Sequence, residues 1–231
     1  MKSNVFSPPP MSRFYAASGL LLMLFMGGAY LFGMQGMPDL TDGAAIAAWY
    51  RTRGSLDGEV ACALVTVAFF FTYWFLGVAM AWLRAAEKCD HRSGGQLTWI
   101  AFFGGVAFTT IFACALAFVL APAMLIGKGI STDAIYLMHT ASLLTGVTAS
   151  TTGPAFFAPI AIVAFRTGFL PRWLAWFTVI CAVGSVVPLF GAFTLDGPFN
   201  VGNGWAGIHA VAASWVGWSG VTSAWFLGRP K

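Results

Sequence analysis

Six apolar stretches dominate the sequence, and each is long enough to cross a lipid bilayer as a helix. A transmembrane helix needs about 20 mostly apolar residues, and a bilayer core holds no water to pair an exposed backbone group. The stretches are continuous and lack the alternating pattern of barrel strands. We therefore expect an all-α, polytopic transmembrane bundle of six helices. The expected spans cover residues 14–34, 60–83, 97–121, 134–165, 173–193 and 204–227.

The composition excludes the soluble classes of protein. Apolar residues make up 58% of the 231 residues and charged residues only 9%, whereas a soluble domain carries about 25% charged residues. So little charge cannot cover so much apolar surface in water. A water-soluble enzyme, a soluble nucleic-acid-binding domain and a disulfide-rich scaffold are therefore excluded.

The charged residues predict the orientation of the bundle. All twelve Lys and Arg residues lie outside the spans or at their edges, nine on one side and three on the other. By the positive-inside rule, the side with nine is cytoplasmic. We expect a bacterial cytoplasmic-membrane protein with a Pro-rich inner tail over residues 1–13, one transmembrane domain over 14–227 and a short inner tail over 228–231. The basic balance then reflects topology and attraction to lipid head groups, and no nucleic-acid partner is expected.

The first outer loop contains an amphipathic segment. Asp42 is placed to cap a short helix over residues 43–51, which gathers Ile46, Trp49 and Tyr50 on one side. Trp and Tyr favour the membrane–water boundary. We expect a separate short helix lying flat on the outer surface, either as a strut or as a lid over an external pocket.

The fourth span contains a break. Its 32 residues would extend about 48 Å as a straight helix, beyond a hydrocarbon core of about 30 Å. Proline removes a helical hydrogen bond, and neighbouring hydroxyl groups can satisfy the carbonyls that it frees. We expect either a compensated kink or a broken helix of the kind that builds transport sites. The residues that mark the break are Thr151, Thr152, Gly153, Pro154 and Pro159.

Two histidines lie within the spans. His139 and His209 each fall roughly 8–9 Å below the outer end of their helix at 1.5 Å per residue. The faces that carry them are small and partly polar, and Ser142 shares the face of His139. We expect these faces to line an outer-leaflet pocket. The residues predicted to line it are Tyr30, His139, Ser142, Trp205 and His209.

A seven-residue segment at the start of the fifth span resembles a known sequence. Residues 170–176 read Leu-Pro-Arg-Trp-Leu-Ala-Trp. The segment is similar to the Leu-Pro-Arg-Trp-Leu-Gly-Trp of a group of uncharacterised bacterial membrane proteins common in actinobacteria. Ala175 replaces their usual glycine. The resemblance implies a six-helix layout and an inner-membrane location, and it implies no catalytic residue.

Three functions remain open from the sequence. The leading hypothesis is a membrane protein without a catalytic motif that binds a small apolar ligand or lipid. The same protein would alternatively serve as a membrane subunit, with partner subunits or further copies of itself. A second hypothesis is a redox protein with a haem or metal held by His139 and His209, because neutral imidazole is a common ligand for both. A third is a facilitator for a neutral solute, since no charged residue lies within a span.

Overall fold

The computed structural model describes residues 13–33, 36–38, 40–90, 94–194, 197–200 and 208–228. Within these residues the regular structure is entirely helical, which confirms the predicted all-α class. Five segments are long and apolar enough to cross a membrane. They are Arg13–Gly33, Leu56–Asp90, Gln96–Leu125, Thr132–Thr167 and Arg172–Gly191.

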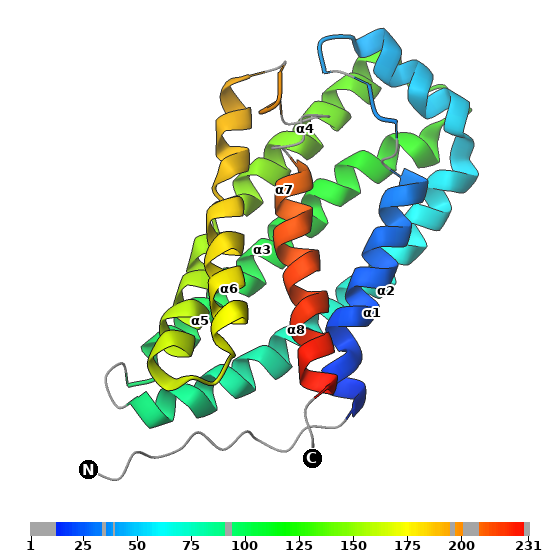
Figure 1. Ribbon diagram of the computed structural model, residues 1–231. Coiled ribbons are helices and arrows are strands. Elements are labelled where there is room, and N and C mark those ends of the chain that lie inside the picture. The colour runs from blue at the N-terminus through cyan, green and yellow to red at the C-terminus, as the bar shows by residue number, and fades with distance from the viewer. Residues whose placement is uncertain are drawn as a thin grey trace.

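The helices pack as a bundle (Figure 1). In chain order they are α1 (Arg13–Gly33), α2 (Gly43–Asp90), α3 (Gln96–Leu125), α4 (Thr132–Ser150), α5 (Gly153–Thr167), α6 (Arg172–Gly184), the 3-10 helix η1 (Val187–Phe193), α7 (Ile208–Ala212), the π-helical turn η2 (Ala213–Gly217) and α8 (Trp218–Leu227). Helix α1 begins and α8 ends at the lower end of Figure 1, where α2 turns to α3 and α5 turns to α6. We call this the lower end and the opposite one the upper end.

Helices α1 and α8 pack closely because α1 has a glycine at the contact. A Cβ added to Gly19 would overlap Ser219 and Ser223 of α8. The Gly19 amide donates a hydrogen bond to Ser223 Oγ at 3.0 Å. Small residues allow such close approach between helices in lipid. The last helix is therefore fixed against the first.

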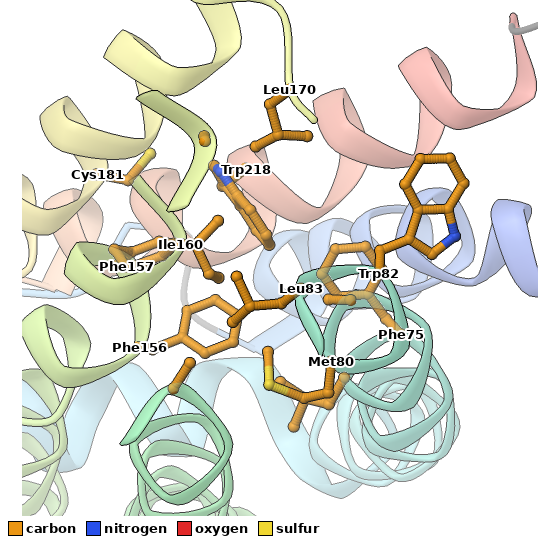
Figure 2. Close-up of a cluster of buried hydrophobic side chains, with 14 of the residues drawn as sticks. Phe75, Met80, Trp82, Leu83, Phe156, Phe157, Ile160, Leu170, Cys181 and Trp218 are labelled. Atoms are coloured by element: carbon orange, nitrogen blue, oxygen red, sulfur yellow. The ribbon is translucent and has the colours of Figure 1, made fainter. Parts of the chain in front are cut away.

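An aromatic core fills the lower half of the bundle. Trp215 of η2 stacks on Phe108 and Phe156, with ring centroids 3.8 and 4.5 Å apart. Figure 2 shows Phe156 beside Trp218, whose indole Nε1 donates to Thr178 Oγ1 at 2.8 Å. Aromatic pairs at such distances add to the gain from burial. This core joins α3, α5, α6 and α8.

The expected separate helix over residues 43–51 is wrong. The structure shows one helix, α2, which runs without interruption through 48 residues. Asp42 does cap its start, since Asp42 Oδ1 accepts from the Ala45 amide at 2.9 Å. No proline lies between residue 43 and the predicted second span at residue 60, and Gly58 lets α2 pass closely over Ala123 of α3. Continuing the helix therefore satisfies the backbone at no steric cost.

The first part of α2, residues 43–56, packs onto the bundle, and we call it the α2 arm. Only Leu56–Asp90 of α2 is counted among the membrane-spanning segments, and Figure 1 shows the helix changing direction between its upper part and this segment. Ile46, Ala47 and Tyr50 of the arm are buried. Arg51 donates to Thr132 Oγ1 at 3.0 Å at the start of α4. The arm is a strut against α3 and α4.

The fourth span is interrupted between α4 and α5. Helix α4 ends at Ser150 and α5 begins at Gly153, with Pro154 in its first turn. Pro159 lies within α5, which continues to Thr167. The chain therefore breaks at Thr151 and Thr152, before the prolines.

The segment over residues 170–176 has some side chains in the core and others exposed on the surface. Leu170 and Leu174 are buried, whereas Trp173 and Trp176 are more than half exposed. Pro171 precedes the first turn of α6. Exposed indoles of this kind favour a membrane–water boundary.

A buried carboxylate caps α3 at the lower end. Glu87 is only 2% exposed. Its two oxygens accept hydrogen bonds from the amides of Leu97 and Thr98 at 2.9 and 3.0 Å, and from Thr98 Oγ1 at 2.5 Å. A negative charge is favourable where a helix begins. Gly95 precedes α3 and offers no side chain to cap it, so α2 supplies the cap.

We expect Glu87→Gln to destabilise the protein by about 2 kcal/mol, because it removes a charged acceptor and sets an amide N–H₂ against the donors of α3. The matched control is Glu59→Gln, an exposed carboxylate on the same helix. Reversible unfolding in mixed micelles measures the difference. Equal stabilities for the two variants would contradict the capping role.

Candidate functional site

A cavity of about 470 Å³ lies in the upper half of the bundle, between α1, α2, α3 and the α7–η2 segment. Along α1 its lining runs from Met23 to Gly33, which corresponds to about 15 Å of helix. The wall is almost entirely Gly, Ala, Val, Leu, Met and Phe. Pockets that bury small molecules have volumes of about 300–1,000 Å³ and mostly apolar walls. The cavity is therefore suited to an apolar ligand.

Two glycines keep the cavity open. A Cβ added to Gly27 of α1 or to Gly217 of η2 would meet no atom within 4 Å. Both residues line the cavity. The contrast with Gly19, which is in contact with α8, shows that glycine has two roles here. One brings helices together and the other leaves space between them.

The polar side chains of the described lining are Tyr30 and His209, at the upper end of the cavity. Tyr30 Oη and His209 Nδ1 lie 3.4 Å apart, a long hydrogen bond. Their rings meet edge to face, with centroids 5.7 Å apart. The structure thus brings together two of the five predicted pocket residues. Trp205 lies outside the described residues.

His139 and Ser142 belong to a different site, on the other side of α3. His139 is fully buried, and its Nδ1 lies 3.0 Å from Tyr50 Oη. Tyr50 Oη also donates to the carbonyl of Val119 at 3.1 Å. Ser142 Oγ donates to the carbonyl of Ala115 at 2.6 Å. These bonds join α4 and the arm of α2 to α3, whereas the Val119 side chain faces the cavity.

The bonds of Tyr50 determine the tautomer of His139. A phenol has one hydrogen, and Tyr50 donates it to Val119. His139 Nδ1 must then carry a hydrogen and donate it to Tyr50. Burial raises the pKa of the Tyr50 phenol, so the donor stays protonated at physiological pH. The pair therefore fastens the α2 arm to the bundle.

The redox hypothesis would place one haem or metal between His139 and His209. The Nε2 atom of His139 is buried and has no hydrogen-bond partner among the described residues. Each histidine is bonded instead to its own tyrosine. The described residues contain no cluster of three or more His, Cys, Asp or Glu side chains that could hold a metal. A ligand would reach His139 only after neighbouring side chains moved.

The hydroxyl groups at the α4–α5 break are used within the helix. Ser150, Thr151 and Thr152 each donate to the carbonyl three residues earlier, at 2.5, 2.8 and 2.7 Å. A Cβ on Gly153 would overlap Ser185, so the break is closely packed against the end of α6. These residues do not line the 470 Å³ cavity. The hydroxyl groups at the break therefore bond to backbone carbonyls of the same segment and not to a ligand.

The sequence missed the residues that shape the cavity. Gly27 and Gly217 give no pattern that separates an open glycine from a packed one. Val119 is one of many apolar residues on α3. Tyr50 was expected only at a surface, although its position seven residues after the start of α2 places it on the buried face with Ile46. The α2 arm had to be seen in place before its partners were evident.

The chain matches no known protein family, no curated protein and no solved structure. The function is therefore argued from the geometry of the cavity and from the chemistry of its lining.

We expect Tyr50→Phe to loosen the α2 arm, because Val119 O and His139 Nδ1 would both lose their buried partner. Amide hydrogen exchange over residues 43–56 should become faster by about tenfold, as expected for a loss of about 1.4 kcal/mol. Tyr73→Phe is the matched control, an exposed tyrosine on the same helix. Unchanged exchange in the Tyr50 variant would show that the arm is held by apolar contacts alone.

Proposed function

We propose that the protein spans the bacterial cytoplasmic membrane six times and binds a small apolar ligand or lipid in the cavity beside α1. The observation that carries the proposal is the apolar 470 Å³ cavity whose polar pair, Tyr30 and His209, lies at one end. A lipid of the outer leaflet has a matching arrangement of polar and apolar parts, with its polar head at the membrane boundary and its apolar tail below. The membrane itself is then the source of the ligand.

The sixth span in this proposal is the α7–η2–α8 segment. It covers residues 208–227 without interruption, and 20 residues of helix extend about 30 Å, the thickness of the hydrocarbon core. Helix α8 packs along α1 through Gly19 and Ser223. An even number of spans places both ends of the bundle on the same side of the membrane.

The distribution of charge supports a cytoplasmic lower end. The described basic residues of the lower end outnumber those of the upper end by five to three. By the positive-inside rule this end faces the cytoplasm. The cavity then opens in the outer leaflet. The lower-end residues are Arg13, Arg84, Lys88, Arg166 and Arg172, and the upper-end residues are Arg51, Arg53 and Lys128.

Filling the cavity tests the proposal. Gly27→Phe would place a ring in the cavity, since the space around this position is open. Gly77→Phe is the matched control, because Gly77 also has open space around it but is exposed on α2, away from the cavity. Both variants should fold, because a Cβ at either position meets no protein atom within 4 Å.

The measurement is photolabelling in lipid nanodiscs with an apolar diazirine-bearing alkane, read by peptide mass spectrometry. In the wild type and in Gly77→Phe, the label should attach to the peptides that carry Met23 and Phe112, which line the cavity. In Gly27→Phe this labelling should fall by at least about fivefold, the effect of losing about 1 kcal/mol of binding. Equal labelling of all three proteins would contradict the proposal.

A further inference from the structure

The upper end of the cavity specifies the head group of the ligand. We infer that the ligand is a neutral, single-chain lipid. Its hydroxyl or carbonyl head lies beside Tyr30 and His209 and accepts a hydrogen bond from one of them. Its chain extends along α1 toward Met23. This inference rests on the proposed function and adds the chemical class of the ligand.

The Tyr30–His209 pair keeps one hydrogen to donate. A phenol and a neutral imidazole carry one O–H and one N–H between them. Their mutual bond, at 3.4 Å between Oη and Nδ1, uses one of these hydrogens. If Tyr30 donates, the His209 Nε2–H remains; if His209 donates, the Tyr30 O–H remains. Either tautomer therefore offers a donor, to which an acceptor oxygen of the ligand head can bind.

The lining favours a head group without charge. The described lining contains no Lys, Arg, Asp or Glu. A charged head would enter an apolar cavity without a counter-ion, which costs far more than burying a neutral polar group. The nearby Arg53 is already engaged, since it donates to the carbonyl of Phe32 at 2.6 Å and lies over the Trp49 ring at 5.0 Å.

The depth of the cavity suits one chain of one leaflet. Its lining on α1 spans about 15 Å of helix, half of a hydrocarbon core of about 30 Å. Below it lies a much smaller cavity of about 40 Å³. The two share Met26, Phe112, Ala212 and Val216 in their walls. The smaller cavity therefore adjoins the lower end of the larger one, which leaves room for one chain of a single leaflet in the larger cavity.

A series of three photoreactive lipids tests the inference. The probes share one chain length and one mid-chain diazirine, and they differ only in the head group: a hydroxyl, a carboxylate or a trimethylammonium. In the wild type, the alcohol should label the Met23 peptide at least about fivefold more than either charged probe. The double variant Tyr30→Phe/His209→Phe should reduce labelling by the alcohol at least about fivefold, because it removes the donor to the hydroxyl, and should leave labelling by the apolar diazirine-bearing alkane unchanged. Tyr73→Phe, at an exposed tyrosine of α2, should label with the alcohol as the wild type does.

The outcomes separate the inference from the proposed function. Preference for the carboxylate or the ammonium probe overturns the neutral-head assignment. Equal labelling by all three probes that Gly27→Phe still blocks also overturns it, while the apolar binding site stands. Labelling by the alcohol that is unchanged in Tyr30→Phe/His209→Phe overturns the role of the pair. Labelling that Gly27→Phe does not reduce overturns the proposed function itself.

Discussion

Backbone amides and carbonyls have no water to bond with inside a bilayer, and the structure of this protein depends on how each helix end satisfies that requirement. At the break between α4 and α5, the hydroxyl groups of Ser150, Thr151 and Thr152 donate to carbonyls of the preceding turn. At the start of α3, Glu87 of α2 accepts from two amides. Polar side chains are thus used mainly to complete helices. Few remain for a ligand, and this makes the Tyr30–His209 pair in the cavity wall distinctive.

Glycine residues are used in two different ways in this bundle. Helices in lipid associate through close packing, because lipid tails are as apolar as the side chains they meet. Gly19 and Gly153 serve this packing, since an added Cβ would overlap α8 or Ser185. Gly27 and Gly217 do the reverse and leave unfilled space. The bundle thus packs tightly around its lower aromatic core and leaves a cavity of about 470 Å³ above it.

The sequence predicted the elements better than their partners. The length that a spanning helix needs is set by the thickness of the bilayer alone, so length and composition were enough to predict the all-α class. The structure confirms this class. The separate helix over residues 43–51 was a wrong prediction, because nothing in the local sequence distinguishes a helix that stops from one that continues into the span. His139 and His209 were expected at similar depths. Their partners depend on the rotation of each helix and on α3 lying between His139 and the cavity, and neither can be derived from spacing along one chain.

The central claim is that the cavity holds one neutral lipid, and native mass spectrometry of the protein released from membrane-derived nanodiscs tests it most directly. The account predicts a bound species at one copy per chain, identified after release as an uncharged single-chain lipid. It should be absent from Gly27→Phe and retained in Gly77→Phe. A wild-type protein that carries only charged phospholipids, with the same set in both glycine variants, would contradict the account.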